Sequence, residues 1–266
     1  MSLSIIIRSQ VNQGENCMSS FIYSVAQIKT ERENFKYNME KHLEYIKMAA
    51  DNNSGIIIFP ELSLIGYERK LARNQFFVKN DTRLDCLQKA SVDQNIVIVA
   101  GAPLLLKGQL YIASWIFTPD NLQQIYLKKY LHSGEELYFQ SSNQFDPIIT
   151  LGDKQISFAI CYDIENEKHI ECVKNKKSDY YAASIFYSKG GIQSGLNRLK
   201  YIAKEYSIDV LMSNYVGECW ETEAGGSSSI WSRSGELVIS ADEHSECLLI
   251  AENSNEEWKG KIIKNK

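Results

Sequence analysis

The most informative stretch of the chain is Ile156-Ser157-Phe158-Ala159-Ile160-Cys161-Tyr162-Asp163, an apolar run that ends at a thiol and then at polar residues. Short apolar runs of this kind are typical of buried strands in parallel sheets. A side chain at the carboxyl end of such a strand projects into the crevice where open α/β sheets bind ligands. Cys161 is therefore a candidate nucleophile, and a buried structural cysteine is the alternative when the stretch is taken alone.

Two further segments place charged side chains in the same way. Gly55-Ile56-Ile57-Ile58-Phe59-Pro60-Glu61 ends in a carboxylate, and Ile125-Tyr126-Leu127-Lys128-Lys129-Tyr130-Leu131 carries two lysines. A buried charge is costly unless it has a partner or a function, so the three strand ends offer an acid, an ammonium and a thiol. Taken singly, the acid also fits a structural ion pair and the lysines fit solvent-exposed positions. Successive strand residues face opposite ways, so only one lysine can point inward.

Together these segments resemble the pattern of the nitrilase superfamily of carbon–nitrogen hydrolases. The resemblance is carried, in order, by Phe59-Pro60-Glu61, Tyr126-Leu127-Lys128-Lys129-Tyr130-Leu131 and Ile160-Cys161-Tyr162-Asp163. It continues through Leu62-Ser63-Leu64-Ile65-Gly66-Tyr67, Ser213-Asn214-Tyr215-Val216-Gly217 and Gly225-Gly226-Ser227-Ser228, and it spans Phe21 to Glu252. Several motifs in register over one chain are far more specific than any one of them. The chain is similar to the small bacterial stand-alone amidohydrolases of this superfamily.

The resemblance implies a catalytic triad of Glu61, Lys128 and Cys161. Cys161 would attack the substrate carbon, and Glu61 would move the thiol proton to the leaving amine and later activate water. Lys128 would lower the thiol pKa and donate to the oxyanion. The family register selects Lys128 over Lys129, because it stands three residues before Leu131. We expect the three side chains to lie within hydrogen-bonding reach of one another around one small cavity.

Further residues are expected to support this site. Many members of the superfamily carry a second carboxylate after the lysine; Glu135 and Glu136 both fit, and Glu135 is preferred as the lysine's partner. The backbone N–H of Tyr162 would contribute to the oxyanion hole. The remaining candidates secure the backbone near the pocket or line its walls, and they are Asn214, Tyr67 and Phe186.

Alternating strand and helix signals predict an α/β protein. Strands are predicted at 22–28, 55–59, 96–100, 110–117, 124–128, 156–160, 180–186 and 210–213, with a hairpin over 228–239. Apolar residues at spacings of three and four predict helices at 35–50, from 81 onward, at 166–173 and at 196–206. The resemblance implies that these elements form a four-layer αββα sandwich of the nitrilase type. It also implies that subunits pair into a homodimer or a higher homo-oligomer.

Composition limits the possible functions. The chain has 266 residues, 44% of them apolar, which suffices for a single domain. The family resemblance begins near Phe21 and so implies a domain over 21–266 after an extension over 1–20, with Met18 as a candidate natural start. A net charge of −4 and a pI near 5.7 argue against nucleic acid and anionic membranes as partners. No apolar run is long enough for a signal peptide or a membrane span, so a cytoplasmic location is expected.

Cysteines and histidines give no metal signature. Six cysteines without a Cys-x-x-Cys pair predict neither a zinc site nor a disulfide framework, as is typical of a reducing compartment. Among four histidines, His42 and His244 are expected to be exposed, and His169 with Cys172 is too little for a metal site. His132 is expected to line the pocket at most, with Glu61 as the base. The sequence predicts no metal and no cofactor.

The leading hypothesis is a thiol amidohydrolase that cleaves a non-peptide C–N bond of a small carboxamide through an acyl-enzyme and releases ammonia or an amine. A nitrilase acting on a small nitrile and a catalytically inert ligand-binding member are the alternatives. Ile164-Glu165-Asn166-Glu167-Lys168-His169 stands where many amidases of this group have an arginine and Phe-Pro-Glu. An arginine contact to a carboxylate-bearing substrate is therefore not expected at that position, and the sequence does not specify which amide or nitrile is bound.

Overall fold

The computed structural model describes residues 20–264 and contains two large β-sheets. The predicted extension over 1–20 lies, except for its last residue, outside this range, as does Met18. The seven-stranded sheet has the order β15 (Glu257–Lys264), β14 (Cys247–Ser254), β1 (Phe21–Gln27), β2 (Ile56–Ile58), β3 (Val97–Leu106), β4 (Gln109–Thr118) and β5 (Leu122–Leu127). The six-stranded sheet has the order β13 (Leu237–Ser240), β12 (Ser229–Trp231), β9 (Asp209–Ser213), β8 (Tyr180–Ser184), β7 (Lys154–Ile160) and β6 (Ile149–Leu151).

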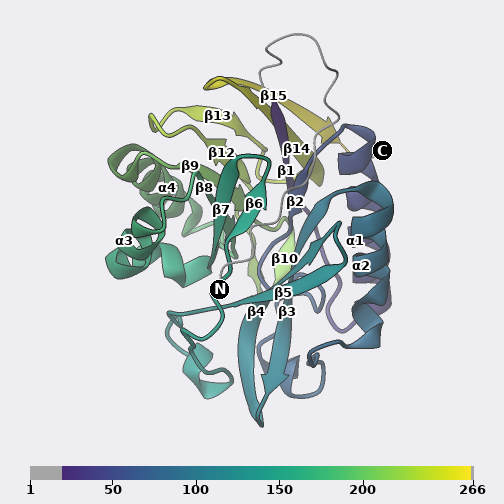
Figure 1. The fold of residues 1–266 in the computed structure, drawn as a ribbon. Coiled ribbons are helices and arrows are strands. Elements are labelled where there is room, and N and C mark those ends of the chain that lie inside the picture. The colour runs from purple at the N-terminus through teal and green to yellow at the C-terminus, as the bar shows by residue number, and fades with distance from the viewer. Residues whose placement is uncertain (1–19, 265–266) are drawn as a thin grey trace.

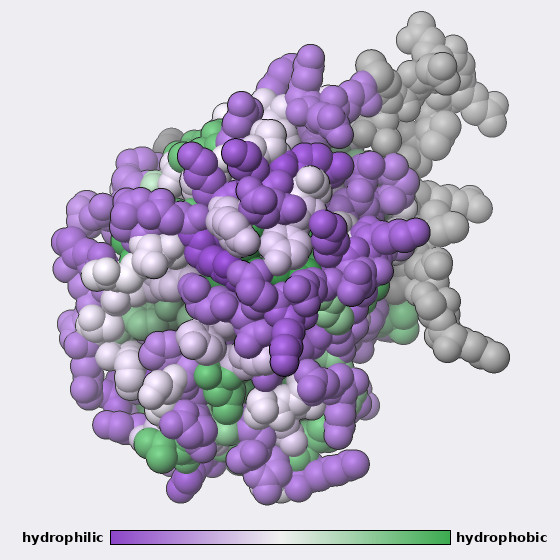
Figure 2. Space-filling model, turned by 90° about the vertical axis from the view of Figure 1, so that its left-hand side faces the viewer, coloured by the Kyte–Doolittle hydropathy of each residue, from purple (hydrophilic) through white to green (hydrophobic). Residues whose placement is uncertain are grey.

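Helices cover the outer faces of the two sheets. Helices α1 (Phe35–Asp51) and α2 (Asp85–Gln94) lie on one side of the molecule, and α3 (Glu167–Asn175) and α4 (Ile192–Tyr206) lie on the other, with both sheets between them (Figure 1). The predicted α/β class and its layered arrangement are therefore confirmed. The side that carries α3 and α4 is mostly hydrophilic, with hydrophobic residues exposed in small separate patches (Figure 2). The pairing of subunits stays a prediction.

Each sheet has a parallel centre, and this determines where the candidate residues emerge. Strands β1, β2 and β3 are parallel, as are β7, β8 and β9, while the outer strands pair antiparallel. Strand β5 is separated from β3 by the antiparallel β4 and so runs parallel to β3. Parallel strands end at the same edge of a sheet, so the segments after β2 and β5 leave the larger sheet at the same edge, with β3 and β4 between them. The segment after β7 leaves the other sheet.

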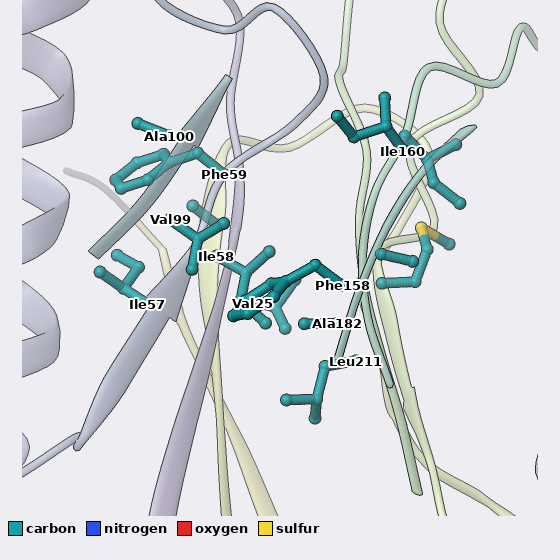
Figure 3. Close-up of a cluster of buried hydrophobic side chains, with 14 of the residues drawn as sticks. Val25, Ile57, Ile58, Phe59, Val99, Ala100, Phe158, Ile160, Ala182 and Leu211 are labelled. Carbon is teal, nitrogen blue, oxygen red and sulfur yellow. The ribbon is translucent and has the colours of Figure 1, made fainter. Parts of the chain in front are cut away.

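The core between the sheets is made of aliphatic and aromatic side chains. Figure 3 shows Val25 and Ile58 of the larger sheet and Phe158 and Leu211 of the smaller sheet pointing into the space between the sheets. All four are at most 1% exposed. Strands that are buried on both faces explain why the sequence shows apolar runs here in place of strict alternation.

Most predicted elements are found within a few residues of their predicted ends. Helix α2 begins at Asp85 rather than 81, because the Asp81 side chain accepts from the N–H of Arg83 and starts a 3₁₀ turn, η2 (Thr82–Leu84), first. Strand β5 ends at Leu127, one residue before Lys128. The sequence did not predict β6 or the β14–β15 hairpin. Within residues 20–264, no helix is long and apolar enough to cross a membrane.

Candidate active site

Glu61 lies in a tight loop after β2 that is anchored to the neighbouring strand β3. At Gly101 of β3, an added Cβ would lie 2.3 Å from the backbone nitrogen of Leu62, so only glycine allows the loop to approach this closely. The N–H of Leu64 donates to the Gly101 carbonyl at 2.9 Å. The Tyr215 hydroxyl donates to the Glu61 carbonyl at 2.5 Å. These contacts fix the backbone that carries the Glu61 carboxylate.

Lys128 connects two buried carboxylates. Its Nζ lies 2.7 Å from Oε1 of Glu61 and 2.8 Å from both carboxylate oxygens of Glu135. All three side chains are fully buried. Oε2 of Glu61 is also buried and has no hydrogen-bond partner within residues 20–264. A buried acceptor without a partner is costly, so this oxygen is available for a proton that arrives from a neighbouring group.

The structure distinguishes between the neighbouring residues that the sequence left as rivals. Glu135 opens a 3₁₀ turn, η3 (Glu135–Leu137), and is buried, with Oε2 accepting the His132 N–H at 2.9 Å, whereas Glu136 is exposed. Lys129 points away from this cluster, because its Nζ lies 2.5 Å from the carboxylate of Asp146. Lys128 and Glu135 are thus the members of each pair that face Glu61.

Cys161 directly follows β7 and begins a 3₁₀ turn, η4 (Cys161–Glu165). Its backbone φ is +44°, a left-handed conformation that costs a non-glycine residue free energy and is concentrated at functional sites. The side chain is 7% exposed, and its Sγ–H donates to the Phe186 carbonyl at 3.6 Å. The expected hydrogen bond of the Cys161 thiol to Glu61 or Lys128 is therefore not present in this structure. The acid and the lysine bond to each other, and the thiol bonds to the backbone.

Burial and neighbouring charges shift the pKa values of Glu61 and Lys128. Burial raises the pKa of Glu61 to about 7, against the opposing effect of the Lys128 charge. Burial alone would lower the pKa of Lys128, but the charge of Glu61 and the other acidic groups outweigh it, and the pKa rises above its ordinary value. Lys128 is thus an ammonium at any physiological pH and cannot serve as the base.

The charge of Lys128 acts in the expected direction, because it lowers the pKa of Cys161, but other effects on this thiol are larger. Burial raises the pKa of Cys161, the negative charge of Glu61 raises it further, and Lys128 opposes these two effects without outweighing them. The resting group is therefore a protonated thiol. A nucleophile of this kind needs a neighbouring base to remove its proton as it attacks.

A cavity of about 870 Å³ opens above Cys161. Tyr67 and Phe186 form one wall, with their rings stacked at a centroid distance of 4.2 Å. Tyr162 and His132 also line the cavity, in an edge-to-face contact at 5.4 Å. Glu61 and Lys128 are not among the lining side chains, so the ion cluster is closed off from the opening.

The other predicted residues are distributed as follows. Asn214, directly after β9, accepts the Tyr187 N–H at 2.9 Å and donates to the Gly226 carbonyl at 2.8 Å, so it contacts backbone behind the cavity. His244 is exposed. The prediction that His42 is exposed is wrong: it is fully buried, because its ring stacks on Phe59 and both of its nitrogens have partners.

The sequence alone did not indicate the role of Asp163, which connects the segments of the site. This residue is the last one of the Ile160-Cys161-Tyr162-Asp163 motif. Asp163 is fully buried; Oδ1 accepts the N–H groups of Lys129 and Tyr130, and Oδ2 accepts that of Ile160. The sequence alone also did not indicate Arg69, which lines the cavity. Within residues 20–264, no group of three or more histidine, cysteine or acidic side chains is arranged to hold a metal ion.

The sequence profile of the carbon–nitrogen hydrolase family matches residues 24–260, which is most of the chain. The chain belongs to the carbon–nitrogen hydrolase family. Among solved structures of this fold, a mutant amidase from Nesterenkonia sp. AN1 in complex with butyramide superposes with a TM-score of 0.80 at 17% identity, covering 89% of this chain and 92% of that one. Another mutant of the same amidase, with a TM-score of 0.80 at 18% identity and covering 88% and 91% of the two chains, shows covalent addition of the acetamide moiety of fluoroacetamide at its active-site cysteine.

Two curated relatives that this chain matches are longer proteins. The glutamine-dependent NAD(+) synthetase of Acinetobacter baylyi is 26% identical over 255 residues, which cover 92% of this chain and 46% of the relative. The enzyme of the same name from Thermotoga maritima is 23% identical over 225 residues, covering 81% and 39%. The chain therefore spans less than half the length of the curated relatives that it matches.

Proposed function

We propose that the chain is a thiol amidohydrolase that cleaves the C–N bond of a small carboxamide, with Cys161 as nucleophile, Glu61 as proton shuttle and Lys128 as oxyanion donor. The observation that supports this most strongly is the buried Glu61–Lys128–Glu135 cluster beneath a strained cysteine at the end of a parallel strand. Three buried charges are costly for a fold to maintain, and this cost is typical of a functional site.

The hydrogen bonds of the cluster leave one oxygen of Glu61 free to accept a proton. Lys128 occupies Oε1 of Glu61 and leaves Oε2 without a partner, so Oε2 is the acceptor for the Cys161 proton. As Sγ bonds to the carbonyl carbon, the π electrons move to oxygen, and the ammonium of Lys128 and the N–H of Tyr162 stabilise the oxyanion. The carbonyl then re-forms, the C–N bond breaks, and Glu61 returns its proton to the leaving nitrogen.

A second half-reaction restores the thiol. Water attacks the thioester while Glu61 accepts one of its protons, and the acid product leaves as that proton returns to Sγ. A pKa of Glu61 near 7 suits both directions, because the group must accept and donate a proton within one turnover. Glu135 keeps Lys128 in place throughout by accepting from its Nζ.

Ammonia release from an amide panel tests this proposal. The panel contains butyramide, acrylamide and glutamine, together with butyronitrile, and each is assayed with the wild-type chain, Cys161→Ala and Cys172→Ala. Cys172 lies half-buried on α3, away from the cavity lining, and serves as the matched control. We expect amide turnover that Cys161→Ala abolishes and Cys172→Ala retains, and fluoroacetamide should add one acetamide group at Cys161. Turnover that persists in Cys161→Ala would reject the nucleophile, and turnover of the nitrile alone would reject the substrate class.

A further inference from the structure

Arg69 is an almost completely buried cation in the wall of the cavity. It is 5% exposed, and its Nη2 donates to the Tyr67 hydroxyl at 2.9 Å. Nη2 lies 3.7 Å from Oε1 of Glu135, which is an ion pair beyond hydrogen-bonding distance. Its Nε is buried and has no hydrogen-bond partner within residues 20–264. A guanidinium has five N–H donors, and the Nε–H of this one is a buried donor that the described part of the protein does not satisfy.

Trp220 fixes the plane of this guanidinium. The Arg69 Cζ lies 4.1 Å from the Trp220 ring centroid, so the cation stacks on the indole. Trp220 and Glu221 form the two-residue turn between β10 (Glu218–Cys219) and β11 (Thr222–Glu223), with φ values of +47° and +61°. Such turns favour asparagine and glycine, because side chains with a Cβ are strained there. The hairpin thus holds a strained tryptophan against the arginine.

Arg69 and Cys161 are linked through the same wall. Arg69 bonds to Tyr67, the Tyr67 ring stacks on Phe186, and the Phe186 carbonyl accepts from Cys161. Two carboxylates, of Glu165 and Glu221, also line the cavity, and that of Glu165 is engaged by the Tyr187 hydroxyl at 2.8 Å. Among the charged side chains in this wall, Arg69 is the one that combines burial with an unsatisfied donor.

We propose that Arg69, stacked on Trp220, is an anion subsite that binds a carboxylate carried by the substrate beyond its scissile amide. The inference rests on the proposed amidohydrolase function. A planar guanidinium fork matches a carboxylate in two parallel hydrogen bonds, and its weak hydration suits a desolvated pocket. Arg69 lies outside the segment after Cys161, where the sequence has no arginine to bind a substrate carboxylate. The subsite comes from the loop after β2.

Succinamate and butyramide are the matched substrates that test the subsite, because they share a four-carbon amide and differ at the far end, carboxylate against methyl. We expect kcat/KM of the wild-type chain to favour succinamate by roughly 10- to 100-fold, the range of a hydrogen-bonded charged group. Arg69→Gln should bring the ratio close to one, and Arg69→Lys should keep part of it. Arg73→Gln, at an exposed arginine in the adjacent turn η1 (Lys70–Arg73), should keep the wild-type ratio.

Binding to the Cys161→Ala chain separates this inference from the proposed function. Calorimetry with the two amides needs no turnover, and tighter binding of succinamate supports the subsite even if the wild-type chain hydrolyses neither amide. If the wild-type chain also turns over none of the amides in the panel, the hydrolase proposal fails while the subsite stands. Equal binding and equal turnover of both amides by the wild-type chain would overturn the subsite without any Arg69 variant. Equal loss of both activities in Arg69→Gln, with its ratio unchanged, would also overturn it.

Discussion

The backbone N–H of Tyr130 donates to Oδ1 of Asp163 at 2.8 Å, and this bond ties together the two segments that carry the lysine and the thiol. Tyr130 lies two residues after Lys128, and Asp163 lies two residues after Cys161. The two segments leave different sheets, so their relative position depends on contacts between them. Oδ2 of the same carboxylate accepts the Ile160 N–H at 2.9 Å. One buried side chain therefore positions both strand ends.

A buried hydrogen-bonded chain in turn positions Asp163. The Tyr126 hydroxyl donates to Oδ2 of Asp163 at 2.7 Å, so its oxygen must accept from Nε2 of His169, which also lies at 2.7 Å. Nδ1 of His169 lies 2.7 Å from the Tyr181 hydroxyl. A neutral imidazole protonated at Nε2 satisfies both bonds, because it donates to Tyr126 and accepts from Tyr181. Burial lowers the pKa of His169, which favours that neutral form.

Replacing Asp163 by asparagine should therefore reduce activity more than its small change in volume suggests. An amide has one oxygen and two donors, so it cannot accept from all four groups, and at least one buried donor loses its partner. We expect kcat for a turned-over amide to fall by about 10- to 100-fold, with a loss of roughly 2 kcal/mol in the free energy of unfolding. Steady-state kinetics and urea titration measure the two effects.

Asp153→Asn is the matched control, because Asp153 is an exposed carboxylate in the turn between β6 and β7. It should leave both quantities close to the wild-type values. If Asp163→Asn retained wild-type kcat, the carboxylate would not position the two segments.

Sequence patterns identified the candidate site residues because strand ends are local features. The runs before Glu61 and Cys161 are mostly apolar strands buried on both faces, and the family register of the lysine segment favoured Lys128 over Lys129. Family resemblance supplied the layer arrangement, which periodicity alone could not. The strands and helices were predicted from the spacing of apolar residues, which is also a local feature, and most of them are found.

The residues that hold these groups in place were harder to predict, because their roles depend on long-range pairing. Asp163 bonds to residues 33 and 34 positions away, and a lone aspartate after a cysteine carries no sign of that. His42 is polar on a helix whose outer face is also polar, so helical periodicity placed it outside. Arg69 lies two residues after Tyr67 in a loop, where the chain path and hence the direction of the side chain are not encoded in any repeat.

The pH dependence of the reaction should report the pair Glu61 and Glu135. Glu61 must be ionised to accept the thiol proton, so activity of the wild-type chain should rise as the pH increases through about 7. The negative charge of Glu135 raises the pKa of Glu61. Glu135→Gln removes that charge, so the pKa of Glu61 falls and the acidic limb of the kcat/KM profile moves to lower pH. The maximum rate should also fall, because Lys128 loses a charged partner.

Glu136→Gln is a control at the adjacent position, where the side chain is exposed. It should leave the acidic limb where the wild-type chain has it. If the acidic limb stayed unchanged in Glu135→Gln, or moved equally in both variants, the charge of Glu135 would not determine the pH profile.

His42 should make the fold less stable in acid. Its Nδ1 lies 2.6 Å from the Asn38 carbonyl and its Nε2 lies 2.8 Å from the Ser63 hydroxyl, and a neutral ring protonated at Nδ1 satisfies both contacts. Burial lowers the pKa of His42 from 6.5 to about 4. Between those values the unfolded chain binds a proton that the folded chain does not, so stability falls as the pH falls through this window. The expected loss from this group is roughly 3 kcal/mol.

Urea unfolding at several pH values between about 7 and 4 measures this loss through the free energy of unfolding. His42→Gln cannot take up the proton, so its stability should be lower at neutral pH and fall less steeply toward acid than that of the wild-type chain. Part of the slope should remain, because the pKa of His169 is also lowered. His244→Gln, at an exposed histidine, should keep the wild-type slope. Equal slopes for His42→Gln and the wild-type chain would mean that His42 does not stay neutral in the folded protein.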